Sequence, residues 1–460
     1  MAMDYDITWS VAAATSLTGV AGHTLTSLYI AGSLCLSVLL TIQSAYTLYL
    51  MIYTWDRPDA YRAAQAPSHF LPPQKSFTVL LPCRHEEEVI QSTIERVIRA
   101  RYPLSLLEVV VICSPDDTGT IAKAQQKIAQ LRERGVGGVR VIAYRGTPIN
   151  KPHGLNAGVR ATRNEVVTIF DAEDDIHPDI FNIVNTLMVS ERINVVQCGV
   201  QLMNYQSTWY SALNVLEYFF WFKSRLHYHA RLGSVPLGGN TVFFTRTVLE
   251  QVGGWDEQNL TEDADIGIRI SCLGEPIRVV YDDRYVTREE TPPTLAHFIK
   301  QRTRWSQGFL QTLMKGEWRR FPTRRQRLLA LYTLSFPSVQ AFLGLYVVAA
   351  VVSMLAIKTP MLAAIILFLP CYLLVAHFCL SIFGLYDFAD AHKLNPRWTT
   401  LVVMALGYLP YQWVLAYSAL RATLRQMRGI NNWEKTKHIG AHREQLHVVS
   451  ASETAADPAA

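Results

Sequence analysis

The sequence predicts an α/β domain with a parallel sheet, inserted between transmembrane helices. Short apolar runs alternate with helical patterns over residues 76–290, as expected of successive βα units. Uncharged segments long enough to cross a bilayer lie on both sides of this region. Half of the 460 residues are hydrophobic and only 18% are charged, whereas roughly 25% are charged in soluble proteins.

The composition argues against several other classes of protein. The net charge is only +5 and the basic residues cluster beside apolar segments, so we expect no nucleic acid as a partner. The seven cysteines include no Cys-x-x-Cys pair and no zinc-type spacing, which predicts buried, reduced thiols. The first 25 residues contain no lysine or arginine, so we expect no cleaved secretory leader.

The chain begins with an N-terminal segment and one predicted transmembrane helix, within residues 1–55. The uncharged stretch 25–53 is longer than the roughly 20 residues that a spanning helix needs. A linker is expected over 56–75, which contains four prolines.

The first half of the α/β domain is expected to form four parallel strands, with amphipathic helices between them. The predicted strands are 77–81, 108–113, 139–144 and 166–170, and the predicted helices are 86–101 and 118–134.

Residues 291–327 interleave many basic residues with large apolar ones, which predicts amphipathic helices in the membrane interface. Three apolar segments then predict transmembrane helices within 328–425. The tail 426–460 is expected to be cytoplasmic, with a disordered end. The three apolar segments are 328–357, 360–386 and 398–420.

The charge distribution leaves a conflict in the membrane topology. It predicts a multi-pass protein of the inner (plasma) membrane with a cytoplasmic α/β domain and an external N-terminus. Three later spans would put the C-terminus outside, yet five basic residues between 421 and 437 predict a cytoplasmic C-terminus. Either one late segment is re-entrant or interfacial, for example broken at Pro337 or Pro410, or 360–420 hides another crossing.

The most polarised stretch is the apolar strand 166–170, which ends in four carboxylates within five residues. Ligands of open α/β sheets bind beyond the carboxyl ends of the strands. Crowded carboxylates favour a hard cation, Mg²⁺ or Mn²⁺, that would hold a diphosphate. A solvated acidic loop is the alternative. The four acids are Asp171, Glu173, Asp174 and Asp175.

Acidic residues also follow the first two predicted strands. Glu87 could contact the base or ribose of a nucleotide, or it could simply complement a helix dipole. Asp116 and Asp117 could accept hydrogen bonds from the same groups, or they could stand in an ordinary turn.

Four more candidates lie before and after the acidic strand. Lys151 could meet a phosphate as a point charge, or it could be a solvated loop lysine. Thr261, Glu262 and Asp263 begin a predicted helix. A carboxylate there could act as a general base, or the segment could serve only to cap the helix.

The amphipathic region carries the run Gln301 to Trp305. Trp305 could stack on a sugar ring, and Arg304 could pair with a diphosphate leaving group. The alternative is a Trp that anchors an interfacial helix beside Arg side chains that reach into water.

The order and spacing of these motifs resemble the processive family 2 membrane glycosyltransferases, which include cellulose, chitin and hyaluronan synthases. The resemblance covers residues 76–320 by motif and the rest by membrane layout. It implies a GT-A (Rossmann-like) domain that transfers a sugar with inversion from a nucleotide-diphosphate sugar, usually a UDP-sugar, with Mg²⁺ or Mn²⁺. The family often elongates a β-linked polysaccharide and moves it across the membrane.

The resemblance also implies roles for single residues, with Asp171 facing the diphosphate and metal and Asp263 as the general base. The donor-binding residues would be Glu87, Asp116, Asp117, Lys151, Asp171 and Arg304, the catalytic group Thr261, Glu262 and Asp263, and the acceptor-binding residues Gln301 and Trp305.

Two departures from the family pattern leave points open. The usual Asp-x-Asp is here Asp171-Ala172-Glu173 followed by two more acids, so any of the later three could complete the metal site. The acidic pair after the second strand stands behind Ser114 and Pro115, which leaves the contact with the base open. The segment 431–436 resembles a Trp-x-Lys-Thr segment that could gate the site or only anchor the tail.

Two rival functions remain. A non-processive transferase with a lipid-linked acceptor would share the donor site, whereas a receptor or assembly subunit with a degenerate domain would lack the acids that are present here. The expected partners are a nucleotide-sugar donor, a growing polysaccharide or lipid-linked acceptor, the bilayer, and accessory export proteins or a second copy of the chain.

Overall fold

The computed structural model describes residues 5–356 and 360–434, and it divides the chain into two compact units. Lys435, Thr436 and the end of the tail, for which disorder is expected, lie outside the described residues. The first unit comprises Met1–Tyr49 and Phe342–Leu380, and the second comprises Leu50–Ala341 and Ser381–Ala460.

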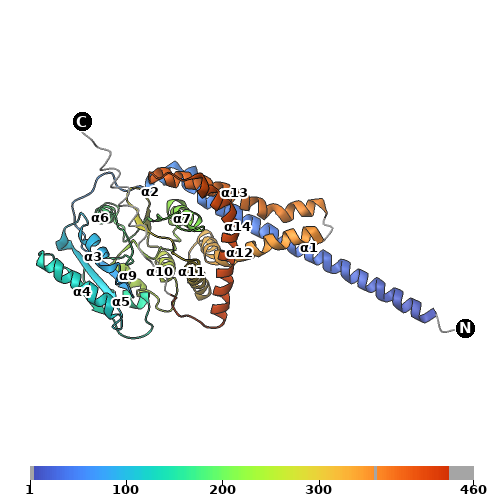
Figure 1. Ribbon diagram of the computed structural model, residues 1–460, viewed down its shortest axis with the longest axis horizontal. Coiled ribbons are helices and arrows are strands. Elements are labelled where there is room, and N and C mark those ends of the chain that lie inside the picture. Colours follow the sequence, from blue (N-terminus) through green and yellow to red (C-terminus); the bar gives the residue numbers. More distant parts are fainter. Residues whose placement is uncertain (1–4, 357–359, 435–460) are drawn as a thin grey trace. The chain divides into compact units, whose positions relative to one another are not determined.

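Fourteen α-helices are present among the described residues, and Figure 1 shows most of their labels. They are α1 (Tyr5–Asp56), α2 (Pro58–Ala64), α3 (Ile90–Ile98), α4 (Thr118–Glu133), α5 (Lys151–Arg160), α6 (Ile180–Ser190), α7 (Ser211–Phe220), α8 (Leu226–Leu232), α9 (Arg246–Val252), α10 (Glu262–Cys272), α11 (Leu295–Lys315), α12 (Arg324–Ala356), α13 (Met361–Ala391) and α14 (Trp398–Met427).

A seven-stranded sheet forms the centre of the second unit, in the order β3-β2-β1-β4-β7-β5-β8. A separate parallel pair joins β6 to β9. The strands are β1 (Phe77–Cys83), β2 (Leu107–Cys113), β3 (Val139–Ala143), β4 (Val166–Ile169), β5 (Val195–Cys198), β6 (Val200–Leu202), β7 (Val242–Thr245), β8 (Ile277–Val280) and β9 (Thr287–Glu289).

The four predicted strands are confirmed as β1 to β4, and their pairings with one another are parallel. The expectation of a fully parallel sheet is wrong, because β7 runs antiparallel to both of its neighbours, β4 and β5. The chain reaches β7 through the α7–α8 region rather than through a single crossover helix, so the geometry that enforces parallel pairing does not apply there.

Helices cover both faces of the sheet because alternate residues of each strand point to opposite sides. Phe77, Val79 and Leu81 of β1 form one apolar cluster with residues of α3, α4 and α6. On the other face α5 lies so close that a Cβ at Gly158 would be 3.0 Å from the side chain of Leu80. Each of these fully buried strand residues contributes roughly 1.5–3 kcal/mol.

The sheet order creates a switch point at β1. The chain adds β2 and β3 on one side of β1 and then returns to place β4 on the other side. In open α/β sheets the ligand binds at such a point, beyond the carboxyl ends of the strands. The loops after β1, β2 and β4 therefore surround the expected binding site.

The predicted membrane segments are helical wherever the structure describes them. Among the described residues, four helices are long and apolar enough to cross a membrane, and this makes the chain a membrane protein by composition. Within the first unit, Ser37 of α1 donates a hydrogen bond to the Ile366 carbonyl of α13 (2.6 Å). Tyr346 of α12 donates another to the Leu367 carbonyl (3.0 Å). The four candidate spans are Ser27–Asp56, Arg324–Val352, Met361–Ala391 and Trp398–Met427.

Candidate active site

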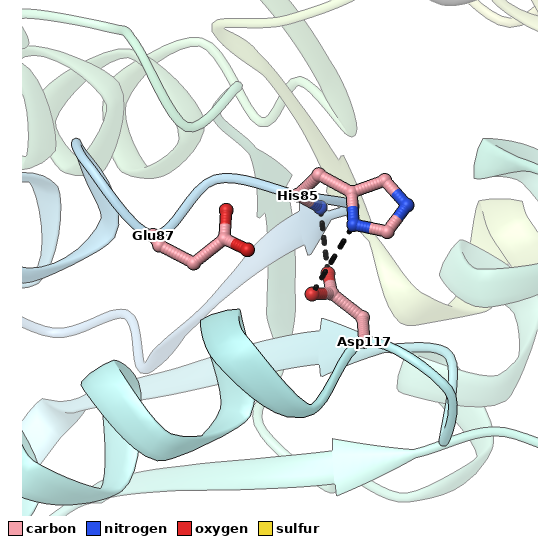
Figure 2. A group of neighbouring side chains, drawn as sticks. All are labelled: His85, Glu87 and Asp117. Carbon is pink, nitrogen blue, oxygen red and sulfur yellow. Dashed lines mark hydrogen bonds and ion pairs between the residues drawn. The ribbon is translucent and has the colours of Figure 1, made fainter.

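The loops after β1 and β2 are joined by Asp117. Its buried carboxylate accepts hydrogen bonds from the backbone N–H of His85 (2.7 Å) and, as the N-cap of α4, from that of Thr120 (3.3 Å). Figure 2 shows His85 and Glu87 on the loop after β1 and Asp117 at the turn that enters α4. These contacts fix the loop after β1 on the start of α4.

Glu87 lies against the first turn of α4. A Cβ at Gly119 would come within 2.6 Å of the Glu87 Oε1 atom, so glycine leaves the room that this carboxylate occupies. The partial positive charge of a helix N-terminus favours an anion there. Ligand atoms of His85, Glu87 and Asp117 lie within 4.8 Å of one another, so this group could hold a metal ion.

Asp116 is the exposed member of the acidic pair. Its carboxylate accepts a hydrogen bond from Arg84 (3.2 Å) and another from the hydroxyl of Ser114. The Ser114 hydrogen bond and the charge of Arg84 hold the pKa of Asp116 below its ordinary value. Ser114, which separates the pair from the strand end, therefore favours the ionised form of Asp116.

Lys151 links the end of β4 to the loop before β7. Its ammonium donates to Asp171 Oδ1 (2.6 Å) and to the carbonyl of Gly239 (3.0 Å). The lysine is the first residue of α5, which Asn150 caps by accepting from the N–H of His153 (3.0 Å). Burial lowers the pKa of Lys151, but Asp171 and the other nearby acids outweigh it and raise the pKa above its ordinary value. Lys151 is therefore a fixed positive charge beside Asp171.

A buried acidic group lies behind Asp171. Asp174 accepts hydrogen bonds from the Asp171 N–H (2.8 Å) and from the Asn240 amide (2.9 and 3.0 Å), which also contacts Glu289. Burial and the charges of Glu289 and Asp171 raise the pKa of Asp174 well above its ordinary value. Burial, Asp171 and Glu173 likewise raise the pKa of Glu289 to about 8. Four carboxyl groups thus share a small region, which is the kind of donor set that a hard cation stabilises.

The four acids after β4 are not equivalent. Asp175 forms an ion pair with Arg96 of α3, and its backbone N–H donates to the Arg288 carbonyl (3.0 Å). Asp174 is fully buried and Asp171 contacts Lys151. Glu173 is 8% exposed and is close enough to Glu289 to raise its pKa.

Asp263, in the first turn of α10, lies near Lys151. Its Oδ1 atom accepts from the N–H of Ala264 (2.8 Å). A Cβ at Gly239 would lie 3.1 Å from Asp263 Oδ2 and 3.7 Å from Lys151 Nζ, so the acid and the lysine meet above this glycine. Thr261 is the N-cap residue of α10, but its side chain makes no capping hydrogen bond.

The first two residues of α10, Glu262 and Asp263, are harder to ionise than ordinary carboxylic acids. Burial and the charge of Asp263 raise the pKa of Glu262 to about 7. Burial also raises the pKa of Asp263, while the positive charges of Lys151 and Arg304 oppose that rise. A carboxylate with a raised pKa is a stronger base, which suits proton abstraction.

Helix α11 docks on the start of α10 at Gly308. A Cβ there would lie 2.6 Å from Thr261 Cγ2 and closer still to the Thr261 amide nitrogen. One and two turns earlier on α11 are Trp305 and Gln301. The Arg304 guanidinium carbon lies 4.4 Å from the ring centre of Trp433. The close approach at Gly308 therefore places the predicted acceptor motif next to the predicted base.

The remaining contacts of the motif involve aromatic and amide groups. The Trp305 ring lies 6.0 Å from that of Tyr218 on α7 and 4.8 Å from the Arg302 guanidinium carbon. Gln301 is buried, and its Oε1 atom accepts no hydrogen bond from any described residue. An amide oxygen in that state can accept a hydrogen bond from a ligand hydroxyl.

The sequence-predicted residues form two groups at the carboxyl edge of the parallel strands. One contains Glu87, Asp116 and Asp117, and the other contains Lys151, Asp171, Glu173, Asp174, Glu262, Asp263 and Arg304. Asp175 points into a separate ion pair.

Sequence reasoning missed Glu289 and Tyr218, and it did not single out Asn240 within the loop around Pro236 to Thr241, from which we expect the donor-specificity pocket. Glu289 is on the short strand β9 and Tyr218 is on α7. Neither stands in a motif or at the end of a predicted strand, so no spacing signal could have identified them. Asn240 lies beside Gly238 and Gly239, and that Gly-Gly-Asn turn is the only signal that could have pointed to a ligand loop.

Residues 72–308, just over half of the chain, match the protein-family model described as "Glycosyltransferase like family 2". The mannosyltransferase PcManGT from Pyrobaculum calidifontis, solved in complex with GDP-Man and Mn²⁺, has a TM-score of 0.50 and 18% identity to the chain. That match covers 86% of this chain and 99% of the other, and at such identity it shows a shared fold.

Three curated proteins illustrate the range of relatives. The poly-β-1,6-N-acetyl-D-glucosamine synthase of Staphylococcus epidermidis is 25% identical over 290 residues, which are 63% of this chain and 67% of the relative. The probable glycosyltransferase YdaM of Bacillus subtilis is 26% identical over 264 residues (55% and 59%). The β-monoglucosyldiacylglycerol synthase of a Nostoc species is 26% identical over 255 residues (51% and 49%). The chain thus spans about half to two thirds of the length of these curated relatives.

Proposed function

The chain belongs to the family 2 glycosyltransferases and has a GT-A-like domain, and from this we propose that it is a membrane-embedded, inverting polysaccharide synthase. It takes a sugar from a nucleotide-diphosphate sugar, specifically a UDP-sugar, and adds it to a β-linked polymer. The observation that carries the proposal is the meeting of Lys151, Asp171 and Asp263 around Gly239.

The nucleotide half of the donor binds at the loops after β1 and β2. Glu87 and Asp116 offer carboxylate oxygens to the ribose hydroxyls and the N–H group of the base. Asp117 supports them, because its oxygens already accept hydrogen bonds from His85 and Thr120. For the same reason we favour a nucleotide over a metal ion at the group formed by His85, Glu87 and Asp117.

The diphosphate half binds at the end of β4, with Lys151 as a point charge for the phosphates. The donor set there fits a divalent cation, because buried carboxyl groups with raised pKa values crowd around Asn240. Asp171 and Glu173 would hold Mg²⁺ or Mn²⁺, which would neutralise the diphosphate. Asp175 is less suited to this role because it forms an ion pair with Arg96, and Asp174 because it is fully buried beneath the Asn240 amide.

Transfer proceeds by attack of an acceptor hydroxyl on the anomeric carbon of the donor. Asp263 takes the proton of that hydroxyl as the new C–O bond forms and the bond to the diphosphate breaks. Arg304, which lies near the α10 acids, stabilises the negative charge on the departing diphosphate. Attack opposite the leaving group inverts the anomeric centre and gives a β-linked product from an α-linked donor.

The acceptor lies against α11 and α7. The paired rings of Trp305 and Tyr218 offer an apolar platform for a sugar ring. The buried Gln301 Oε1 atom offers an acceptor for one of its hydroxyls. A platform of this kind holds the end sugar of a chain, which favours an elongating enzyme and export of the polymer through the membrane.

A transferase with a lipid-linked acceptor is the second candidate. Similarity to a β-monoglucosyldiacylglycerol synthase and the small number of candidate spans favour it. Both candidates place the catalytic domain on the cytoplasmic side of the plasma (inner) membrane, where nucleotide sugars are available.

Product size separates the two candidates. The purified protein in detergent is supplied with radiolabelled UDP-sugars and Mn²⁺, and the products are sized. Long products support the polysaccharide synthase, whereas products with a single added sugar on extracted lipid support the second candidate. Absence of nucleoside diphosphate release from every donor contradicts both.

A further inference from the structure

The last apolar helix, α14, exposes large apolar side chains along most of one face. At 100° per residue, nine large side chains fall within an arc of about 100°. Their exposed fractions range from 41% for Leu420 to 79% for Met427. The nine are Trp398, Val402, Leu406, Leu409, Trp413, Tyr417, Leu420, Leu424 and Met427.

The opposite face of α14 contacts the α/β domain near both ends and in the middle, while Gln412 and Ala416 contact Gln340 and Ala341 of α12. Near the start of α14, Gln206 donates a hydrogen bond to the hydroxyl of Thr400 (3.4 Å). Further along, a Cβ at Gly407 would lie 3.1 Å from Trp209. At its end, Arg425 donates to the Gln307 side chain of α11 (3.0 Å).

The middle of the covered face contacts charged groups. Arg302 of α11 forms an ion pair with Glu217 and donates a hydrogen bond to the Tyr411 hydroxyl (3.4 Å). The side chain of Phe298 stacks near the same tyrosine, with ring centres 5.6 Å apart. The ion pair between α7 and α11 therefore lies directly beneath the centre of α14.

These contacts do not fit a helix that crosses the bilayer. From Thr400 to Arg425 the helix rises about 38 Å at 1.5 Å per residue, which is more than the roughly 30 Å of hydrocarbon. A spanning α14 would carry the Glu217–Arg302 pair and the polar loop at Gln206 into the membrane with it. Charged groups at that depth cost several kcal/mol each.

The charges around α14 fit a helix that lies flat on the membrane. Exposed basic residues are present at both ends, Lys393 and Arg397 before the helix and Arg428 after it. A spanning helix would be expected to carry such residues mainly on the cytoplasmic side, whereas a helix in the interface contacts anionic headgroups at both ends. Trp398 and Trp413 add the aromatic side chains that favour this interface.

We propose that α14 does not cross the membrane and instead lies in the membrane interface. Its exposed face is then in the headgroup region of the leaflet that the α/β domain contacts. The chain then crosses the membrane at α1, α12 and α13, an odd number of times. This removes the conflict in the charge pattern, because the basic residues after 421 come to lie on the side of the α/β domain. Helix α11 is covered by α14, and among its residues, all of which are described, Met314 is the one exposed large apolar side chain.

The placement has a consequence for acceptors. Packed helices lie 8–10 Å apart, so Gln301 and Trp305 on α11 are one helix layer from the lipid. A growing polymer or a lipid-linked acceptor can approach them from the membrane surface without crossing the domain.

The sidedness of α14 is tested in full-length protein carrying one epitope after Asn395 and another at the C-terminus. Antibody access is measured in intact spheroplasts and in inverted membrane vesicles. The proposal requires both epitopes to be reached in inverted vesicles and neither in spheroplasts. Epitopes on opposite sides of the membrane would overturn it.

The depth of α14 is tested with a nitroxide or fluorophore on Leu406→Cys, Trp413→Cys or Leu420→Cys, in a Cys35→Ser, Cys379→Ser background. The proteins are placed in vesicles of phosphatidylethanolamine and phosphatidylglycerol with depth-graded quenchers. Positions 406 and 420 are about 21 Å apart along the helix, yet all three labels should report one shallow depth, about 5–10 Å below the headgroups.

Labels at two exposed positions of α13 serve as the control, Leu362→Cys and Val375→Cys, which should differ in depth by most of their ~20 Å separation. A similar gradient along α14 would overturn the proposal. Absence of lipid quenching at all three α14 labels would also overturn it, since the face would then be covered by protein or water.

Discussion

Substitution of Gly308 by alanine tests how α11 positions the acceptor motif. The new Cβ would lie 2.6 Å from Thr261 Cγ2 and closer to the Thr261 amide nitrogen, whereas carbon atoms pack at about 3.5–4.0 Å. Because one of the clashing atoms belongs to the backbone, α11 has to move about 1 Å away from α10. A displacement of that size between reacting groups costs about 100-fold in rate, so kcat should fall by about two orders of magnitude.

The stability change makes this substitution diagnostic. Alanine in a helix interior is favoured over glycine by about 1 kcal/mol, while overpacking costs about 1–3 kcal/mol. The Tm should therefore change by only a few degrees while kcat falls steeply. Ser306→Ala on the same helix is the matched control and should keep both values near those of the wild type. Full activity in Gly308→Ala would refute the argument that this contact sets the geometry of the site.

Three further predictions concern the donor, the metal and the acceptor. Lys151→Met removes a positive charge that lowers the pKa of Asp263. Because the base acts when it is deprotonated, the acid limb of the kcat–pH profile should move to higher pH. An acid limb that does not move would argue against Asp263 as the base. Glu173→Gln should raise the Mn²⁺ concentration for half-maximal activity at least about tenfold. Asp175→Asn should leave that concentration near the wild-type value because Asp175 pairs with Arg96. A larger effect of Asp175→Asn than of Glu173→Gln would instead assign the metal to Asp175. Trp305→Ala should raise the KM for acceptor about three- to tenfold, as expected for the loss of one aromatic stack, with little change in donor binding measured by calorimetry.

The strands in the first half of the domain could be predicted from the sequence because most of their residues are apolar. Each of β1, β2 and β4 is mostly apolar and is followed by a polar turn, which is typical of a buried parallel strand. The carboxyl ends of such strands meet at one edge, so Glu87, Asp117 and Asp171 could be placed in one site before any coordinates were known.

The strands in the second half of the domain could not be predicted in the same way. β5, β7 and β8 are four residues each, too short for a period to separate strand from helix. The antiparallel direction of β7 depends on tertiary packing rather than on its own sequence. Glu289 reaches the acidic group only because β9 pairs with β6, which no local pattern encodes.

The placement of α14 relative to the membrane also could not be predicted from the sequence pattern. Hydropathy alone makes α14 a candidate span, and only its covered face, with Tyr411 against Arg302, distinguishes an interfacial helix from a crossing one. The charge conflict in the sequence left open whether one late segment is re-entrant or interfacial or whether 360–420 hides another crossing.

The most direct test of the proposed chemistry compares the wild type with Asp263→Asn across a panel of UDP-sugars with Mn²⁺. We expect nucleoside diphosphate release by the wild type with at least one donor. Asp263→Asn should bind that donor with nearly unchanged Kd but turn it over about 10²–10⁴-fold more slowly. Near-normal turnover by Asp263→Asn, or no turnover of any donor by the wild type, would contradict the proposed chemistry.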